Sequence, residues 1–413
     1  MLAGKHILVG ISGGIAAYKS LELIRLLRKA GAEVRVTTTK NALKFVTELT
    51  LQTLSGYKVY SDVFAAINEH STEHISLPDW ADLMVIAPAT ANVLGKMAHG
   101  IADDALTTTF CAMRKPVVVA PAMNDKMYLC PATQETMRLL SQWDNITMLD
   151  CAVGELACGT SGRGRMQEPA AIYEAIGYAL TPKDLRGKRI LITAGPTQEK
   201  IDPVRYISNY STGKMGYALT HECRCRGAEV VVVAGPTQYR PTNIELFEQS
   251  PALRIIDIRS AQEMYEACVQ EFPACDMAIL CAAVADFTPQ NTATQKIKKQ
   301  AGQDTLCLTL QKTPDIAAAL GQRKSARQTL IGFALETQNE EANALHKMTS
   351  KGLDMIVLNS LQDAGAGFGC DTNKVTIYRS NGEQTAYPLE SKSTVAKHII
   401  NAALPLLNAA ILR

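Results

Sequence analysis

Three side chains in the front half of the chain are suited to proton transfer and carboxylate binding. His74 lies in the segment TEHISLPDWADL, and histidine titrates near neutral pH, as a general base should. Asn124 directly follows the apolar run KPVVVAPAM. Cys158 lies in the glycine-rich segment GELACGTSGRGRM, where an accessible thiol can donate a proton. Each residue also has an ordinary interpretation: a surface histidine, a turn-forming asparagine and an incidental loop cysteine.

Two glycine-containing turns are suited to binding phosphate. Gly10–Ser20, GISGGIAAYKS, follows an apolar run and opens a helix, so its glycines allow close backbone approach and the helix start offers free N–H groups. Asp202–Leu219, DPVRYISNYSTGKMGYAL, joins Arg205 and Asn209 to a second such turn. The first is not a G-x-G-x-x-G fingerprint, and the second is not a Walker A loop because Met follows Lys214. A glycine turn or a capped helix start without a ligand remains an alternative for each.

A carboxylate and several lysines in the second half favour a nucleotide triphosphate with magnesium. Asp286 ends the apolar run CAAVADF, where a carboxylate can hold Mg2+. The lysine cluster QKIKKQ (Gln295–Gln300) follows it. Lys347 and Lys351 are four residues apart in a helical stretch and therefore share a face. Solvated surface charge is the alternative interpretation of these lysines.

Short apolar strands that alternate with helical stretches position these residues. In the first half the strands are predicted at Lys5–Ile11, Glu33–Thr38, Ala81–Ala89 and Lys115–Met123, with helices around Ala16–Ala30 and 170–179. Continuous apolar runs are typical of strands buried on both faces of a parallel sheet. Pro88 and Pro121 mark the carboxyl ends of two strands, and ligands bind outside such ends in open α/β sheets.

The pattern restarts after a polar stretch, TPKDLRGK at 181–188, which we interpret as an interdomain linker. Strands are predicted in the second half at Lys188–Thr197, 226–237, 254–258, Met277–Phe287, 329–337 and 354–360. The sequence therefore predicts an α/β protein with two doubly wound domains, 1–180 and 189–413.

Composition excludes several classes of protein. The chain has 413 residues, enough for two cores, and a net charge of +2 that indicates neither a nucleic-acid nor a membrane-surface partner. The start lacks the features of a signal peptide, and no apolar run reaches the ~20 residues needed to span a bilayer. The 11 cysteines are scattered without a CxxC pair, which disfavours a cysteine-bound metal and predicts reduced thiols in a cytoplasmic protein.

Ordered motifs in the first half resemble a known family. GISGGIAAYKS, EHISL…WADLMVIAPATAN, PAMNDKMY and ACGTSGRGRM are similar to the flavin-dependent cysteine decarboxylases, above all the phosphopantothenoylcysteine decarboxylases of coenzyme A synthesis. The resemblance implies a flavodoxin-like flavoprotein domain. It implies FMN contacts at Ser12, Gly13, Gly14, Thr38, Thr39, Lys40, Thr90, Ala91 and Asn92.

The same resemblance implies roles for the three reactive residues. His74 is the base, Asn124 grips the substrate carboxylate within a clamp that includes Met123 and Met127, and Cys158 on a flap returns a proton. Tyr128 stands where the family usually has Trp, so an aromatic wall is retained. FMN is needed because loss of CO2 from a cysteine carboxyl leaves a carbanion without delocalisation; oxidation of the thiol-bearing carbon to a thioaldehyde removes that difficulty.

Motifs in the second half resemble the phosphopantothenate–cysteine ligases, which many bacteria fuse behind the decarboxylase. ITAGPT, DPVRYISN, STGKMG, CAAVADF, KIKK, KTPDI, GFALET and KGLD carry the likeness, which implies a Rossmann-like ligase domain that uses CTP through an acyl-cytidylate. Arg205 and Asn209 would handle the acyl-cytidylate, and Lys296 would neutralise charge during activation. The implied CTP site comprises Ala282, Asp286, Lys312, Thr313, Pro314, Asp315, Phe333, Lys347 and Lys351, with Mg2+ on Asp286.

The two implied reactions are consecutive. The substrates would be 4'-phosphopantothenate, L-cysteine and CTP, and the resemblance implies a homo-oligomer in which flavin-domain trimers and ligase-domain dimers build a dodecamer. A flavoprotein acting on peptidyl cysteines or aromatic acids would explain only the first half. A non-enzymatic regulatory subunit would be expected to lack one of the three reactive residues, and an NAD-dependent dehydrogenase would carry the dinucleotide fingerprint.

Overall fold

The computed structural model describes residues 2–64, 72–155, 161–237, 239, 252–298, 305–336, 338–360, 367 and 369–411. The described residues up to Pro182 form one compact unit, and those from Lys183 onward form a second. Leu185, within the polar stretch 181–188, is buried in the core of the second unit.

The first unit is built on a parallel sheet of five strands in the order β2-β1-β3-β4-β5. The strands are β1 (His6–Ile11), β2 (Glu33–Thr38), β3 (Leu83–Ala89), β4 (Val117–Pro121) and β5 (Ile146–Met148). This is the flavodoxin-like order, which reverses direction between β1 and β3. The predicted fold class is confirmed for this half, and β3 and β4 end at Ala89 and Pro121.

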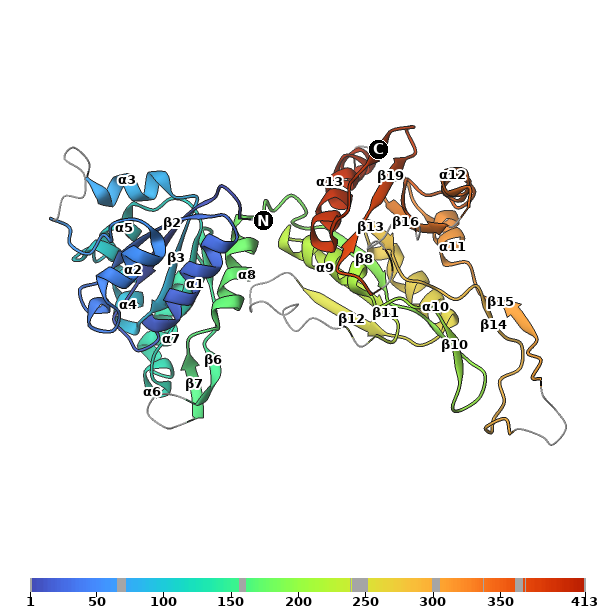
Figure 1. Ribbon diagram of the computed structural model, residues 1–413, viewed down its shortest axis with the longest axis horizontal. Helices are drawn as coiled ribbons and strands as arrows, with labels where there is room; N and C mark the ends of the chain where they lie inside the picture. The colour runs from blue at the N-terminus through green and yellow to red at the C-terminus, as the bar shows by residue number, and fades with distance from the viewer. Residues whose placement is uncertain are drawn as a thin grey trace. The chain divides into compact units, whose positions relative to one another are not determined.

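Helices cover both faces of this sheet (Figure 1). Alternate strand residues such as Val85 and Val118 pack against α1 (Ala17–Lys29), α2 (Glu48–Ser55) and α8 (Pro169–Leu180). Their neighbours Met84 and Val119 pack on the other side, against α3 (Glu73–Trp80), α4 (Ala91–His99), α5 (Ala105–Ala112) and α7 (Pro131–Ser141). A short helix η1 (Ala42–Lys44), helix α6 (Asp125–Tyr128) and a hairpin of β6 (Ala152–Glu155) and β7 (Ser161–Arg165) complete the unit.

The second unit is built on a sheet of eight strands in the order β12-β11-β8-β13-β16-β17-β19-β20. The strands are β8 (Arg189–Ala194), β11 (Glu229–Ala234), β12 (Leu253–Asp257), β13 (Met277–Leu280), β16 (Thr329–Glu336), β17 (Met355–Ser360), β19 (Val375–Arg379) and β20 (Gln384–Ala386). The first six in spatial order are parallel, and β19 and β20 add an antiparallel edge. The parallel part has the Rossmann order 3-2-1-4-5-6, as predicted.

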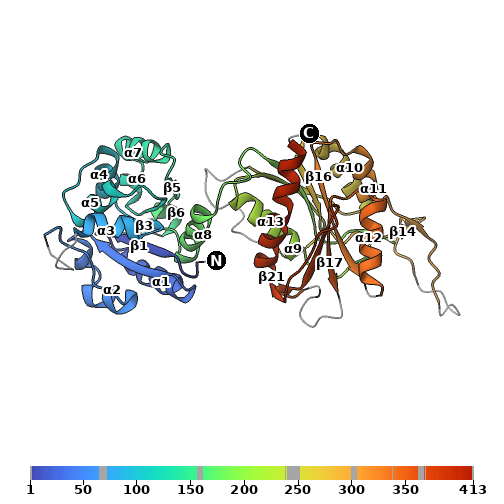
Figure 2. The same ribbon diagram turned by 90° about the horizontal axis from the view of Figure 1, so that it is seen from above.

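Figure 2 shows α9 and α13 on one face of this sheet and α10, α11 and α12 on the other. The bounds are α9 (Lys214–Cys225), α10 (Ala261–Glu271), η3 (Phe272–Ala274), α11 (Ile316–Arg323), α12 (Glu340–Ser350) and α13 (Lys392–Ile411). Among the described residues, no helix combines the length and apolar character needed to cross a bilayer.

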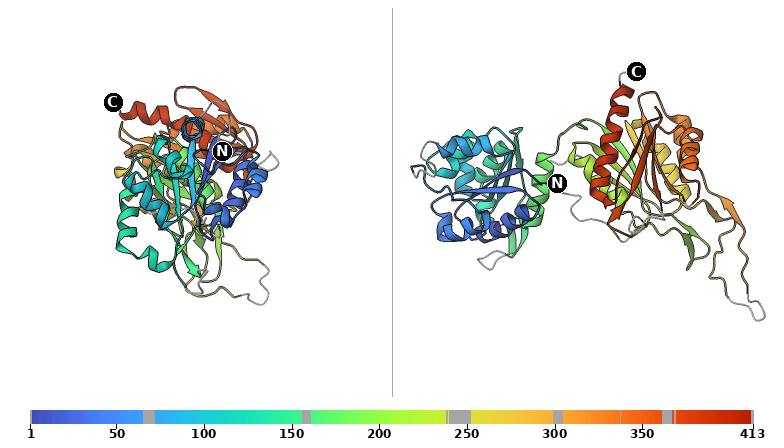
Figure 3. Two further views of the ribbon diagram at one scale, coloured as in Figure 1. Left: turned by 90° about the vertical axis from the view of Figure 1, so that its left-hand side faces the viewer. Right: turned by 45° about the horizontal axis from the view of Figure 1, so that its top comes forward.

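Two small strand pairs extend from the body of the second unit (Figure 3). They are β9 (Gln198–Lys200) with β10 (Tyr206–Ser208) and β14 (Phe287–Pro289) with β15 (Leu310–Lys312). A third pair, β18 (Thr372–Asn373) with β21 (Glu390–Ser391), lies against α13. The strand predicted over Met277–Phe287 stops at Leu280. Beyond it the backbone bonds to the loop after β8 instead: Ala283 N–H donates to Gly195 O at 2.9 Å, and Ala285 N–H donates to Thr197 Oγ1 at 3.0 Å.

Candidate functional site

Ser12 joins the two strands at which the first sheet reverses direction. Its hydroxyl donates to the carbonyl of Pro88 at 2.7 Å and accepts the N–H of Thr90 at 3.0 Å. Ser12 itself is fully buried. The carboxyl ends of β1 and β3 are therefore fixed relative to each other at the place where doubly wound folds bind ligands.

The three segments predicted to contact FMN lie against one another at this edge. A β-carbon at Gly13 would lie 2.5 Å from Cβ of Asn41, and one at Gly14 would lie 3.3 Å from Cγ2 of Thr90. Thr39 Oγ1 accepts the N–H of Ala42, which fixes the loop after β2. The structure thus brings residues 12–14, 38–40 and 90–92 together, and the close approach at Gly13 and Gly14 leaves little room for side chains there.

Buried polar atoms beside this cradle fit a polar planar ligand. Thr38 Oγ1 and the Tyr60 hydroxyl are both buried without a hydrogen-bond partner among the described residues. Burial, and next the charge of Glu73, raise the pKa of the Tyr60 phenol. Helix α4 begins at Ala91 without a side-chain cap on its first N–H groups, which can therefore donate to a ligand. These features match the hydrogen-bonding edges and phosphate of FMN.

His74 lies in the first turn of α3 and is half-buried. The C-terminal residue of α3, Trp80, stacks on His6 at the start of β1, with ring centroids 4.8 Å apart. At the other end of the helix, the buried Glu73 precedes His74, and its charge acts on the Tyr60 phenol beside the cradle. The first turn of α3 therefore lies near Tyr60.

Asn124 caps the short helix α6. Its Oδ1 accepts the N–H of Lys126 at 2.9 Å, so the turn-forming role holds. The amide nitrogen is the group that would donate to a carboxylate, because an amide oxygen only accepts hydrogen bonds. Met123 packs partly into the core, whereas Met127 is 49% exposed.

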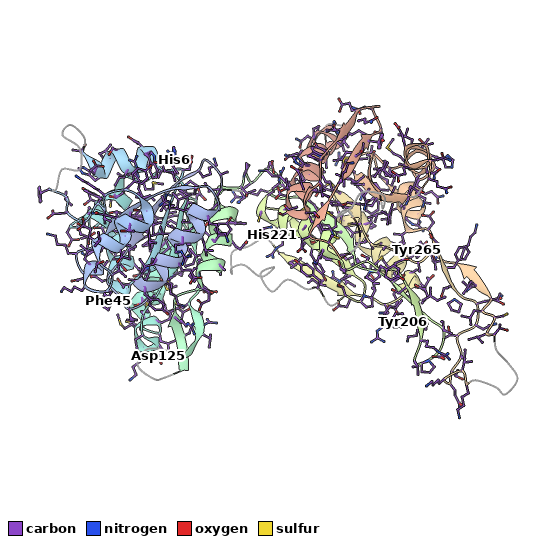
Figure 4. All side chains as sticks on the ribbon, viewed as in Figure 1. His6, Phe45, Asp125, Tyr206, His221 and Tyr265 are labelled. Carbon is purple, nitrogen blue, oxygen red and sulfur yellow. The ribbon has the colours of Figure 1, made fainter. Side chains whose placement is uncertain are left out.

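The β6–β7 hairpin is anchored on the Asn124 segment, near the labelled Asp125 in Figure 4. Met123 N–H donates to Gly164 O at 2.9 Å. A β-carbon at Gly164 would lie 2.4 Å from Met123 O, and one at Gly162 would lie 2.8 Å from Cβ of Asp125. Cys158 lies between these strands in sequence and outside the described residues.

A cavity of about 570 Å3 opens in the second unit where its sheet reverses direction, between β8 and β13. Its walls come from the carboxyl ends of β8, β13, β16 and β17 and from the start of α9. Of the predicted site residues, Asn209, Ala282, Asp286, Lys312, Thr313, Pro314, Asp315, Phe333, Lys347 and Lys351 line it. Residues as far apart in the sequence as Asn209 and Lys351 thus share one cavity.

The cavity favours a polyanion because five lysines and two aspartates line its described part. Lys347 Nζ donates to Phe333 O at 3.0 Å, and burial, followed by the charge of Lys351, lowers its pKa. Lys351 pairs with Asp315 at 2.9 Å. Burial alone would raise the pKa of Asp315. A hydrogen bond from Ala318 N–H and the ion pair with Lys351 outweigh burial, and the pKa is lowered.

Asp286 belongs to the loop after β13, and Asn209 is bonded to the same loop. Asn209 Nδ2 donates to Ala283 O at 2.9 Å, and Asp286 is exposed at the cavity. The Thr313 hydroxyl donates to Ala285 O at 2.6 Å, which joins the cavity segment 312–315 to this loop. No cluster of three or more acidic, histidine or cysteine side chains occurs among the described residues. Mg2+ is commonly held by one carboxylate and substrate phosphates, which Asp286 suits.

Arg205 and Lys296 lie outside the described lining of this cavity. The Arg205 guanidinium donates to both Asp202 Oδ2, through Nε at 3.0 Å, and Ile297 O, at 2.9 Å. Asp202 Oδ2 also accepts Ile297 N–H at 3.1 Å, and the Arg205 contact is the main reason that its pKa is lowered. Asp202 and Arg205 therefore hold the backbone beside Lys296, a function that sequence reasoning did not assign to Asp202.

Comparisons with known proteins agree with both halves. The profile of the family described as "Flavoprotein" matches residues 1–180, and that of "DNA/pantothenate metabolism flavoprotein C-terminal domain" matches residues 185–406. The chain is 45% identical over 403 residues to the coenzyme A biosynthesis bifunctional protein CoaBC of Bacillus subtilis (strain 168), covering 97% of both chains. The chain belongs to the CoaBC family.

Two further similarities bear on this chain. It is 47% identical over 368 residues to a cysteine/cysteine sulfinic acid decarboxylase from an unknown prokaryotic organism, covering 88% of this chain and 100% of that one. A crystal structure of a CoaBC C-terminal domain matches with a TM-score of 0.45 and 40% identity, covering 55% of this chain and 98% of that one. The family predicted from the motifs is confirmed: this is a bifunctional protein of coenzyme A biosynthesis with a flavoprotein front half.

Proposed function

We propose that the second domain joins L-cysteine to 4'-phosphopantothenate at the expense of CTP, and that the first domain decarboxylates the product with FMN. The observation that carries the proposal is the full-length similarity to CoaBC proteins. A lysine-lined cavity in one unit and a flavin-type cradle in the other give each activity a site. The proposed division is 1–180 and 189–413.

The ligase reaction requires two displacements. A carboxylate oxygen of phosphopantothenate attacks the α-phosphorus of CTP, and pyrophosphate leaves; the cysteine amine then attacks the acyl carbon, and CMP leaves. Lys347 and Lys351 would stabilise phosphate charge, and Asp286 would hold Mg2+. Asn209, whose amide is held by Ala283 O, would orient the acyl-cytidylate. Lys296 would neutralise charge during activation, and the bond from Ile297 N–H to Asp202 would hold the backbone next to it.

The decarboxylation requires removal and return of a proton around the thiol-bearing carbon. FMN, when bound, supplies two-electron oxidation of that carbon and later returns the electrons. His74 would take the proton, and the Asn124 amide would hold the departing carboxylate. Cys158 would supply a proton to the enethiol intermediate as the returned electrons reduce it to the thiol product. Residues 12–14, 38–40 and 90–92 would hold the cofactor, and the hairpin base at Gly164 would position the flap.

A second candidate for the first domain is decarboxylation of free cysteine, the activity named for one relative that is 47% identical. It is distinguished by substrate: free cysteine would release CO2 without CTP or phosphopantothenate. The nucleotide-type cavity favours the two-step assignment, because free-cysteine decarboxylation leaves five converging lysines without a role.

We also propose a cytoplasmic homo-oligomer, a dodecamer built from trimers of the first domain and dimers of the second. All ten described cysteines are free, as in a reducing compartment. Large apolar side chains are exposed in both units, including Ile15 and Leu49 in the first and Tyr210 and Phe287 in the second. Light scattering on the purified protein measures the assembly mass, and a monomer would overturn this part.

A half-reaction tests the ligase assignment. Phosphopantothenate, CTP and Mg2+ without cysteine should release about one pyrophosphate per site and then stop, because the acyl-cytidylate waits for the amine. Addition of cysteine should restart the release. Equal release without phosphopantothenate would contradict the assignment. Bound flavin absorbance in the same preparation tests the cofactor, and a colourless protein would contradict the decarboxylase part alone.

A further inference from the structure

Lys392 enters the cavity of the second unit from a part of the chain that the site motifs do not reach. It is the first residue of α13, and its side chain is half-buried among the cavity lining. Helix α13 packs beside α9 through the shared core. The packing of these helices therefore brings Lys392 close to Lys214, the first residue of α9.

Around Lys392, two lysines share one carboxylate among the residues that the structure describes. Lys392 Nζ donates to the carbonyl of Cys370, a neutral acceptor. Asp371, a carboxylate whose charge acts on Lys392, pairs with Lys214 at 2.6 Å and is itself 88% exposed. Burial lowers the pKa of Lys392 because it penalises the charged form of the amine. An incoming anion would offset this penalty, since the one described carboxylate beside the two lysines is already paired with Lys214.

The start of α9 adds backbone donors to the same corner. Its N-cap, Gly213, has φ of +77° and offers no side chain to the first N–H groups. Gly216 allows α9 to approach β8 closely, since a β-carbon there would lie 2.6 Å from Cβ of Ala194. Thr193 at the end of β8 also lines this corner. A helix start after the first strand is where Rossmann folds hold pyrophosphate.

We propose that Lys392 and Lys214, with the start of α9, bind the two terminal phosphates of the nucleotide, the part that leaves as pyrophosphate. The inference rests on the proposed ligase function and assigns its leaving-group subsite. When the carboxylate–phosphorus bond forms, the bond from the α-phosphorus to the bridging oxygen breaks, and the electron pair stays on pyrophosphate. Lys392 stabilises that charge where water is partly excluded.

Calorimetry on the full-length Lys392→Met variant tests the subsite by comparing ligands that share a base. CTP should bind about 10- to 100-fold more weakly, as for loss of one charge-assisted hydrogen bond, while CMP affinity should change less than about twofold. Lys397→Met is the matched control because Lys397 is exposed on the same helix and does not line the cavity; both affinities should be unchanged. Equal weakening of CTP and CMP, or unchanged CTP binding, overturns the proposal.

Chemical protection of the wild-type protein tests the same claim without relying on a folded variant. Pyrophosphate should slow acylation of Lys392 by an amine-reactive ester, measured by mass spectrometry, and should leave Lys397 unaffected; CMP should protect neither. Labelling of Lys392 that pyrophosphate does not slow overturns the subsite. Failure of the ligase assignment would show separately, as absence of pyrophosphate release from wild-type protein given phosphopantothenate and CTP.

Discussion

Replacing Gly216 by alanine should damage the ligase site through packing. A β-carbon at position 216 would lie 2.6 Å from Cβ of Ala194 and 3.3 Å from Thr193 O. Favourable carbon contacts begin near about 3.5 Å, so the start of α9 must retreat from β8 by roughly 1 Å. Overpacking costs about 1–3 kcal/mol, and the better helix propensity of alanine returns about 1 kcal/mol. The net destabilisation should be roughly 1 kcal/mol.

The catalytic effect should exceed the effect on stability. The first N–H groups of α9 would shift with the helix, and a misplacement of about 1 Å can lower catalysis by up to about 100-fold. Pyrophosphate release should therefore show kcat/KM for CTP reduced at least about tenfold. Decarboxylation of supplied phosphopantothenoylcysteine, performed by the other unit, should be unchanged.

Gly95→Ala is the control for this prediction. Gly95 lies inside α4, and a β-carbon there would meet nothing within 4 Å. The substitution should stabilise the first unit by about 1 kcal/mol and leave CTP use unchanged. The packing argument would be refuted if Gly216→Ala retained wild-type kcat/KM for CTP, or if both glycine variants affected the ligase equally.

Four other substitutions address separate parts of the molecule. His74→Asn should leave flavin bound but unreduced when phosphopantothenoylcysteine is added; normal bleaching of flavin absorbance would exclude His74 as the base. Cys158→Ala should accumulate the oxidised enethiol, visible by mass spectrometry, and unchanged turnover would remove Cys158 from the mechanism. Asp202→Asn should weaken the contacts of residue 202 with Arg205 and Ile297. The kcat for pyrophosphate release should fall by a larger factor than the KM for CTP rises, and trypsin should cleave after Lys296 more quickly. An unaltered rate of cleavage would contradict the role of Asp202 in holding this backbone. Lys183 is half-buried, and burial lowers its pKa to about 8 from 10.5, so the folded state loses this proton before the unfolded state does. The unfolding free energy of the wild type should therefore rise relative to that of Lys183→Met between pH 8 and 10.5, by roughly 2 kcal/mol after allowance for partial exposure. A pH-independent difference in unfolding free energy would contradict this.

The sheets were predictable from sequence because their strands are continuous apolar runs. The run at Glu33–Thr38 coincides with β2, and the run ending at Ala89 ends there in the structure. β4 ends at Pro121, the residue expected to mark its carboxyl end, two residues before the end of the apolar run at Met123. The strand predicted over Met277–Phe287 was wrong beyond Leu280, because an alanine-rich loop and a buried strand have similar apolar composition. Its backbone beyond Leu280 bonds to Thr197 and its neighbours, an interaction between segments distant in sequence.

The sites were predictable only where a motif marked them. Neither the capping bond of Asn124 to Lys126 nor the Asp202 clamp leaves a local signal beyond a turn-forming residue. Lys392 was missed because it begins an ordinary amphipathic helix far from any glycine turn. Its place at the cavity depends on the packing of α13 beside α9, which the sequence pattern of α13 alone does not specify.

One chain is proposed to perform two consecutive reactions, ligation and then decarboxylation. Cysteine labelled at its carboxyl carbon, incubated with the purified protein, phosphopantothenate, CTP and Mg2+, tests it most directly. Labelled CO2 should appear only when phosphopantothenate and CTP are both present, with about one CO2 for each pyrophosphate. Release of labelled CO2 from cysteine alone, or pyrophosphate without CO2, would contradict the account.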